Sequence, residues 1–547
     1  MRVTGPWLGV DERTHLHQPA HSRLSINVDY SNGYIEAREG FKTLNQSIAA
    51  DNGQLFIFNS LLDEPYIFIL GYTSATDKIN CQILDLNGIP VGTIDMTTLF
   101  GERAYRDWTC SVTRIPYKEG GSAVLIVTEK STYIWTVSDA ANIRVIDQSE
   151  DSVQVFDTWF YWTTPPACKM AHWHRGRMYY AGFSPDTSFG LTDPAPVDIS
   201  ASHPVLLMAD RQHLKLSSCV ISFSDTYDPV AVRSGHQYTV AYDERVTGLA
   251  SYKDSMLVFT DKNIWITRGD PGSVTTSTPN YPVDKLVNGI GCVSHQSITV
   301  TRAGVFFAGV DGIYLLQEKS VIKVSRPIDG LFGGTTISER RPQGSLTTRL
   351  LDNVKYPWKA NMERLTRIRS FDVPHKNQVW FAIPTLDTYD IAIVFQYDTG
   401  AWSYYAFSQD RSFMSDGDYV VRNGKPLLYT TGSNVLMVSR GDIDYHNSGA
   451  YTRAPASPGA LSKPIPFYWE SARFTSEDEH HLRHFRFNMF KSGNPTSKPE
   501  WFVEGLETKD GRRSYGYLDL HYTTDDPGVW GDDWYVADNA DQNLIFD

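Results

Sequence analysis

The sequence predicts an all-β chain that folds as a β-propeller of about six to seven blades, with inserted loops, a short helix and further β structure at the C-terminus. Three observations predict it. A two-strand unit with apolar residues in both alternation phases recurs along the chain, its period is about 50 residues, and its turns are rich in Gly, Asp and Asn. A hairpin that is apolar on both faces needs a neighbouring sheet on each side, and a closed ring of sheets provides both neighbours.

The clearest unit is DSMLVFTDKNIWIT, residues 254–267, whose first strand begins at Met256. Comparable first strands begin at Val124, Met178, Val305, Val379 and Leu427, and GQLFIFNS with EPYIFILGY, from Gly53, forms an earlier member. Successive starts from Val124 to Leu427 are 54, 78, 49, 74 and 48 residues apart, so three of the spacings are close to one propeller blade. A pair of stacked sandwiches is the alternative architecture.

The two long spacings indicate insertions within 184–252 and within 326–370. The second contains RLLDNVKYPWKANMERLTRIRS, the best helix candidate in the chain, which Pro357 would break or kink. We therefore divide the sequence as follows: 1–50, an N-terminal arm and first strand; 51–440, the propeller; 441–464, a Gly-, Pro- and Ser-rich linker; and 465–547, a C-terminal β region.

Composition limits the function. The 50 Lys and Arg residues against 63 Asp and Glu give a net charge of −13, which argues against a surface built to hold DNA or anionic lipid. The start of the sequence has no apolar signal-peptide segment, and no apolar run reaches ~18 residues, so we expect neither secretion nor a membrane span. The five cysteines are far apart and form no CxxC pair, which predicts buried thiols rather than disulfides or a zinc site.

Motifs with a strong catalytic mechanism are missing: the sequence has no HExxH, P-loop, GxSxG or GxGxxG pattern. We therefore expect no enzyme and no cofactor, although a propeller glycosidase needs only two carboxylates, which sequence spacing does not reveal. DTGAW (398–402) and DPGVW (526–530) are similar to the Asp-box turns of sialidase-type propellers. Tight hairpin turns require the same residues, and we interpret both segments as turns.

Histidines cluster in three groups, and in the last of them a solvated polar loop followed by a strand explains the residues better than a metal site does. The groups are His15, His17 and His21; His172 and His174; and His480, His481 and His484.

Charge is unevenly distributed. Residues 326–370 contain nine Lys or Arg and four Asp or Glu, whereas 525–547 contain seven Asp and no base. The basic segment is either a solvated loop or a contact surface for an acidic neighbouring subunit or for nucleic acid. The candidate interface residues are Arg340, Arg341, Arg349, Arg364, Arg367 and Arg369. The acidic end is most simply a solubilising tail.

Several segments together resemble a known family. They are PWLGVDERTHLHQPAHSRLSINVDYSNGYIEAREGF near the start, HRGRMYYAGF, ISFSDTYDPVAV, GLASYKDSMLVFTDKNIWITRGDPG, IGCVSHQSITVTRAGVFFAGVDGIYLL, AWSYY and PIPFYWESARF. In order and spacing they resemble the tail nozzle proteins of short-tailed bacteriophages, also called tail tubular protein B or tail stabilisation proteins.

This resemblance implies a structural virion protein, made in the host cytoplasm and located in the virion tail. Family members form a homo-hexamer below the portal and the tail adaptor, carry fibres or spikes around it, and extend the channel through which double-stranded DNA leaves. Under this interpretation an acidic lumen would let DNA slide, because no bases would hold its phosphates. The basic arginines would then face a neighbouring subunit or the adaptor.

Two other functions stay open. A glycan- or receptor-binding propeller would carry an exposed aromatic platform, and a propeller glycosidase would depend on a single central acid.

Overall fold

The computed structural model describes most of residues 8–471, apart from short turns and larger gaps at 12–20, 96–109, 146–161, 184–216, 270–282, 334–357, 407–413 and 446–461. Beyond 471 it describes 501–507 and 513–518. The chain divides into two compact units, Met1–Arg473 and Phe474–Asp547.

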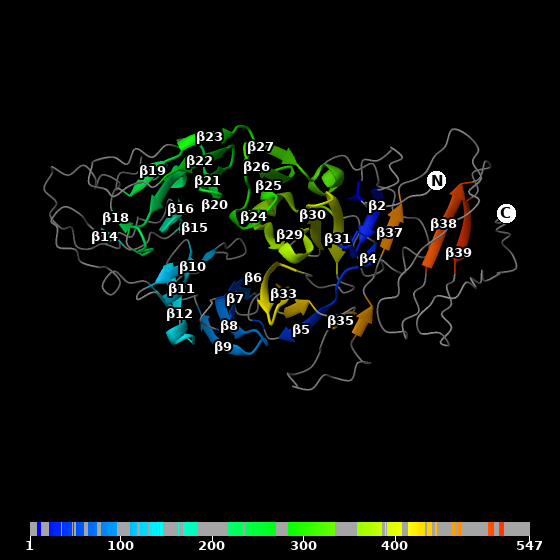
Figure 1. Cartoon of the computed structure of the whole chain (residues 1–547), viewed down its shortest axis with the longest axis horizontal. Coiled ribbons are helices and arrows are strands. Elements are labelled where there is room, and N and C mark those ends of the chain that lie inside the picture. Colours follow the sequence, from blue (N-terminus) through cyan, green and yellow to red (C-terminus); the bar gives the residue numbers. More distant parts are fainter. Residues whose placement is uncertain are drawn as a thin grey trace. The chain divides into compact units, whose positions relative to one another are not determined.

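Five antiparallel sheets of the first unit have four strands each, and we number them as blades 1 to 5 in chain order (Figure 1). Blade 1 is β6 (Asp51–Phe58), β7 (Tyr66–Thr73), β8 (Lys78–Asp85) and β9 (Pro90–Asp95); blade 2 is β10 (Ser111–Tyr117), β11 (Gly121–Val127), β12 (Thr132–Thr136) and β13 (Arg144–Val145). Blade 3 is β15 (Cys168–His174), β16 (Arg177–Phe183), β17 (Val220–Phe223) and β19 (Gln237–Thr239); blade 4 is β20 (Val246–Tyr252), β21 (Ser255–Thr260), β22 (Ile264–Arg268) and β23 (Val283–Val287). Blade 5 is β24 (Thr299–Thr301), β25 (Gly304–Gly309), β26 (Gly312–Gln317) and β27 (Ser320–Lys323).

Two larger sheets contain blades 6 and 7 and recruit strands from both ends of the unit. Blade 6 is β28 (Arg369–Val373), β29 (Gln378–Ile383), β30 (Ile391–Gln396) and β31 (Ala401–Ala406), extended by β1 (Gly9–Val10), β2 (His21–Ile26) and β37 (Tyr468–Ser471). Blade 7 is β32 (Asp416–Arg422), β33 (Lys425–Thr431), β34 (Leu436–Ser439) and β5 (Phe41–Asn45), extended by β35 (Ile443–Tyr445) and β36 (Ser462–Pro464).

The remaining described elements are short. Three strand pairs are β3 (Val28–Asp29) with β4 (Glu36–Ala37), β14 (Trp162–Thr163) with β18 (Val232–Arg233), and, in the second unit, β38 (Trp501–Glu507) with β39 (Arg513–Leu518). The 3-10 turns are η2 (Val137–Asp139), η4 (Ser217–Cys219), η5 (His295–Ser297), η6 (Arg326–Phe332), η7 (Met362–Arg367) and η8 (Pro374–Lys376). Within the described residues, no helix is both long enough and apolar enough to cross a membrane.

The propeller prediction is confirmed, and the described residues form seven blades. Each recurrent hairpin after the first is the middle strand pair of its blade, as with β21 and β22 in DSMLVFTDKNIWIT. The earliest member, from Gly53, supplies the first two strands of blade 1 instead. Every residue of β25 and of β29 is buried. This burial follows from the apolar character of both faces, since each middle strand lies between two neighbouring blades.

Apolar side chains fill the seam between each pair of neighbouring blades, in clusters that together link the described blades into a ring. Between blades 1 and 2 the Trp135 ring lies 5.2 Å from Phe58, centroid to centroid. Between blades 4 and 5 the rings of Phe259 and Phe307 lie 5.1 Å apart. Burial of these layers is the main stabilising contribution to the ring.

The predicted separation of an N-terminal arm, 1–50, is wrong. Strand β5 pairs antiparallel with β34 and so belongs to blade 7, as the blue strand beside the yellow ones in Figure 1 shows. Strand β1 pairs parallel with β31, and Gly9 is required there because a Cβ atom would lie 2.3 Å from the backbone nitrogen of Trp402. The arm therefore covers the open outer edges of blades 6 and 7, which would otherwise expose unpaired backbone groups.

The predicted linker, 441–464, also takes part in the propeller sheets, because β35 pairs parallel with β5 and antiparallel with β36. The division between the two units comes after it, at Arg473. The helix expected in 349–370 is reduced, within the described residues, to the 3-10 turn η7, which is kinked at Arg364. In the first predicted insertion range, 184–252, the segment 184–216 between β16 and β17 of blade 3 lies outside the described residues.

Candidate functional site

The centre of the propeller is the first candidate site, because the first strands of the blades, which line the axis of such a fold, meet there. Turn η5 places Gln296 between blades, and its Nε2 donates to Oε1 of Gln54 in blade 1 at 2.8 Å and to the carbonyl of Cys110, next to blade 2, at 3.0 Å. Arg369 of blade 6 donates from Nε to Oε1 of Gln296 at 2.8 Å.

The same guanidinium reaches the seam between blades 7 and 1. Its Nη1 donates to the carbonyls of Gly53 at 2.7 Å and of Ser415 at 3.2 Å. The Ser415 hydroxyl also donates to the carbonyl of Gly53, at 2.8 Å. Direct hydrogen bonds thus link Gln296, on the turn before blade 5, and Arg369 of blade 6 to blades 1, 2 and 7 in one polar network.

Histidine side chains provide further links between blades 2, 3 and 4. The backbone N–H of Leu249 in blade 4 donates to Nδ1 of His295 at 3.3 Å, and Nε2 of His295 lies 3.4 Å from the hydroxyl of Ser111 in blade 2. His172 and His174 of blade 3 both hydrogen-bond the Ser251 hydroxyl of blade 4, at 2.8 Å each.

Burial lowers the pKa of His172 to about 3 and that of His295 to about 4, and it also lowers the pKa of His174. All three imidazoles are neutral near pH 7. Bases this weak contribute little to general base catalysis at that pH. The contact of Ser251 with two imidazoles therefore serves as a hydrogen-bonded link between blades.

Two carboxylates occupy the seam where blade 7 meets blade 1. Oδ2 of Asp416 accepts the backbone N–H of Leu55 at 3.0 Å, and Oδ2 of Asp418 accepts that of Ile57 at 3.0 Å. Burial raises the pKa of Asp416 to about 6 and that of Asp418 to about 7. Strand β32 therefore binds the inner edge of β6 through side chains instead of through a backbone ladder.

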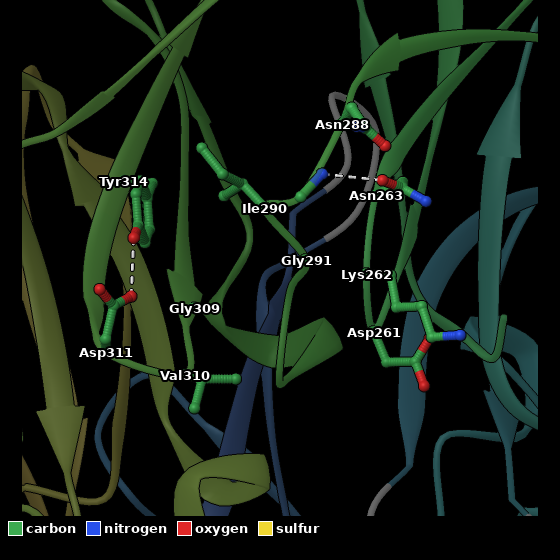
Figure 2. Close-up of a pocket in the computed structure, with 11 residues that line it drawn as sticks. Asp261, Lys262, Asn263, Asn288, Ile290, Gly291, Gly309, Val310, Asp311 and Tyr314 are labelled. Carbon is green, nitrogen blue, oxygen red and sulfur yellow. Dashed lines mark hydrogen bonds between the residues drawn. The ribbon is translucent and has the colours of Figure 1, made fainter.

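A surface pocket between blades 4 and 5 is the second candidate site, with a volume of about 450 Å³ (Figure 2). The β21–β22 turn supplies Asp261, Lys262 and Asn263 on one side. The β25–β26 turn supplies Val310 and Asp311 on the other side. The connecting segment 288–291 crosses between them, and Tyr314 lines the wall beside Asp311.

The side chains of this pocket are held by hydrogen bonds. The Tyr314 hydroxyl donates to Oδ1 of Asp311 at 2.6 Å, as the dashed line in Figure 2 shows. Lys323 donates to Oδ2 of the same carboxylate at 3.0 Å. Asn263 is buried, and its Oδ1 accepts the backbone N–H of Gly289 at 2.9 Å. Such restraints fix polar groups before a ligand arrives.

The predicted arginine interface is only partly within the described residues, since Arg340, Arg341 and Arg349 lie outside them. Arg364 and Arg367 are half-buried on η7, and Arg369 is 7% exposed. All three act electrostatically on buried Tyr389: burial raises the pKa of its hydroxyl, and their positive charges oppose the rise. The prediction that Arg369 belongs to a contact surface is therefore wrong, because its side chain binds inside the propeller.

Other sequence predictions have mixed outcomes. DTGAW contains the tight turn between β30 and β31, with Gly400 at φ 77°, so the turn interpretation is confirmed there. DPGVW, the acidic tail, His15, His17, and the group His480, His481 and His484 lie outside the described residues.

The five cysteines are free and buried, as expected, and the described residues contain no group of His, Cys, Asp or Glu that could hold a metal ion. Sequence reasoning missed Gln54 and Gln296, because a glutamine pair 242 residues apart leaves no local pattern.

No protein-family model matches the chain, and no curated protein matches it. Among solved structures, it is similar to the N-terminal domain of Nup159, at 12% identity over 76% of this chain and 98% of that one, with a TM-score of 0.34. It is also similar to the β-propeller domain of the Trilobed protease from Pyrococcus furiosus (7% identity, 71% and 94% coverage, TM-score 0.32). A third similar structure is Sqt1 from Chaetomium thermophilum, at 13% identity over 79% of this chain and 91% of that one, with a TM-score of 0.33. The strand pairing above defines the propeller, and these similarities add no argument about function.

Proposed function

We propose that this chain is a structural subunit of the tail nozzle of a short-tailed bacteriophage, in which a ring of copies extends the DNA channel below the portal and adaptor. The proposal starts from the ordered segments that resemble that family, above all the N-terminal PWLGVDERTHLHQPAHSRLSINVDY and the blade 4 segment GLASYKDSMLVFTDKNIWITRGDPG.

The hydrogen-bonded network of Gln296 and Arg369 is the observation that supports this function best. Propellers that bind or convert small molecules commonly use an open axial pocket, whereas here Gln296 and Arg369 link blades across the axis with hydrogen bonds of 2.7–3.2 Å. DNA could not pass through such a centre. A channel for DNA would have to form between copies, with each propeller as a solid part of its wall.

The charge distribution fits this arrangement. With a net charge of −13, most of the surface would repel the phosphates of passing DNA, so a lumen lined mainly by carboxylates would not hold it. The basic segment 326–370 would face a neighbouring copy or the adaptor, through Arg340, Arg341, Arg349, Arg364 and Arg367.

Quantitative mass spectrometry of purified particles tests the proposal by counting this protein against the major capsid protein. We expect about six copies per particle, as one cyclic ring requires. The portal protein of the same particles serves as the internal control for a ring component. Absence from particles would refute the nozzle and bring forward a glycan-binding or glycosidase function.

A further inference from the structure

Asparagine followed by glycine is a sequence with its own chemistry. The glycine carries no side chain that would hinder its backbone nitrogen, so this nitrogen can attack the side-chain carbonyl of the asparagine and expel ammonia. The chain contains five such pairs, and the structure restrains them to different degrees. They are Asn32–Gly33, Asn52–Gly53, Asn87–Gly88, Asn288–Gly289 and Asn423–Gly424.

Four of the pairs hold their glycine nitrogen in place. In three of them the glycine N–H already donates a hydrogen bond, and in the fourth Gly53 is buried within β6. The three bonds are Gly33 N–H to the carbonyl of Tyr30 at 3.0 Å, Gly88 N–H to the carbonyl of Asp85 at 2.9 Å, and Gly289 N–H to Oδ1 of Asn263 at 2.9 Å. A nitrogen that must first leave a hydrogen bond or a buried strand reacts more slowly.

The fifth pair forms the exposed tip of the β32–β33 hairpin. Asn423 has a φ of 51° and Gly424 a φ of 72°, as in the two-residue turns that favour Asn-Gly. Neither the Asn423 side chain nor the Gly424 N–H hydrogen-bonds another residue that the structure describes. A Cβ atom on Gly424 would meet nothing within 4 Å. The two reacting groups can therefore approach each other without breaking a tertiary contact.

The charges beside the pairs also differ. Arg422 and Lys425 flank the fifth pair; both are exposed, and neither forms an ion pair with another described residue. The attack passes through an anionic nitrogen and then an oxyanion, and nearby positive charges stabilise both. Two other pairs adjoin carboxylates, which have the opposite effect: Asn32 donates to Glu36, and Nδ2 of Asn87 donates to Oδ2 of Asp85 at 3.2 Å.

We propose that Asn423 is a deamidation site, at which the folded chain converts asparagine to aspartate or isoaspartate. The deprotonated nitrogen of Gly424 attacks Cγ of Asn423, the bond from Cγ to Nδ2 breaks, and ammonia leaves with a proton from water. Water then opens the resulting succinimide ring at either of its two carbonyls.

The product changes the turn in two ways. Its new carboxylate stands between Arg422 and Lys425 and offsets one of their two positive charges. The isoaspartate form also adds a methylene group to the backbone of a two-residue turn, which the register of Arg422 opposite Lys425 does not accommodate. This reaction lies beyond the structural role proposed above and does not depend on assembly into a tail.

The test is incubation of the full chain at mildly alkaline pH and low salt, followed over time by peptide mass mapping. The other Asn-Gly pairs of the same chain are the matched controls. We expect Asn423 to react at least about tenfold faster than Asn32, Asn87 or Asn288, because each of these must first lose a hydrogen bond. In urea the rates should converge, because all the pairs share the glycine that attacks.

Variants test the contribution of charge. Arg422→Gln combined with Lys425→Gln should slow the reaction at Asn423 by about two- to fivefold, as expected for exposed charges. Lys319→Gln, at an exposed lysine in the β26–β27 turn, is the control and should leave the rate unchanged. A rate at Asn423 no higher than at the other pairs, or the same order of rates in urea, would overturn the assignment. No slowing in the double variant would overturn the role of the two bases.

Discussion

Two seams of the propeller use opposite chemistry to bring polar groups inside. Between blades 7 and 1, Asp416 is buried and Asp418 is half-buried, and loss of hydration raises their pKa values to about 6 and about 7. Between blades 3 and 4, His172 is a half-buried base, and loss of hydration lowers its pKa to about 3. Burial favours the neutral form in both places, but it makes the two seams respond to pH in opposite directions.

The signs follow from linkage. An acid with a raised pKa contributes stability that is fully present below its unfolded value of 3.8 and is lost as the pH rises through the folded value. A histidine with a lowered pKa contributes stability that is fully present above 6.5 and is lost as the pH falls toward the folded value. Between about pH 4 and 6.5 the two seams therefore oppose each other, and the whole chain should show a flatter pH profile than either seam alone.

The largest expected loss of stability comes from removing the positive charge that offsets the burial of Asp416 in the seam between blades 7 and 1. Arg369→Ala removes the positive charge that lowers the pKa of Asp416 against the dominant effect of burial, together with donors to two carbonyls and to Gln296. Loss of one partner from a buried charged network costs about 3 to 5 kcal/mol of unfolding free energy. Urea denaturation at pH 7 measures it. Arg175→Ala, at a surface pair, is the control, and a loss no larger than that control would contradict the assigned network.

The second largest effect concerns the pH dependence that Asp418 gives to the seam between blades 7 and 1. Asp418→Asn removes a group that titrates near pH 7 in the folded chain, so the fall in unfolding free energy between pH 5 and pH 8 should shrink by on the order of 2 kcal/mol. Denaturation curves at both pH values give this difference. Asp254→Asn, at an exposed carboxylate, should leave the fall unchanged. An unchanged profile in Asp418→Asn would mean that the carboxylate stays ionised inside the seam.

His172→Asn is the counterpart on the other seam. Asparagine keeps a hydrogen-bonding group toward Ser251 but does not titrate, so the loss of stability from pH 7 to pH 5 should shrink by about 1 to 2 kcal/mol. Thermal unfolding across this range, with His375→Asn at a more exposed site as the comparison, provides the readout. If the variant lost more unfolding free energy from pH 7 to pH 5 than the parent chain does, the conclusion that His172 is neutral in the folded protein would be wrong.

The smallest effect concerns an ion pair on the outside. Lys253 and Glu318 join blades 4 and 5 at 3.2 Å, with side chains that are 63% and 79% exposed. Solvent screens such pairs, so Lys253→Ala should leave stability unchanged at any salt concentration. Melting curves at low and high salt check this prediction. A clear, salt-dependent loss would show that surface charge also holds the blades together.

The blade hairpins could be predicted because their signal is local. Strands such as β25 and β29 are apolar in both phases, and that pattern alone requires sheets on both sides. The strand that closes the ring could not be predicted, since FKTLN at 41–45 is short and its partner β34 is far away in the sequence. The centre was missed for the same reason: Gln54, Gln296 and Arg369 form their links only after separate blades have come together.

The pairing of β5 with β34 also sets an order of events during synthesis. Residues 41–45 leave the ribosome early, but the strand that they complete, Leu436–Ser439, is made almost at the end of the propeller. The nascent chain therefore carries an unpaired strand and an unfinished ring until blade 7 emerges, and such pairing across the whole domain is slow. A cell that makes this protein must protect that strand from other sheet edges during the interval, so the yield of folded protein should depend on elongation rate and on chaperones more than on the stability of any single blade.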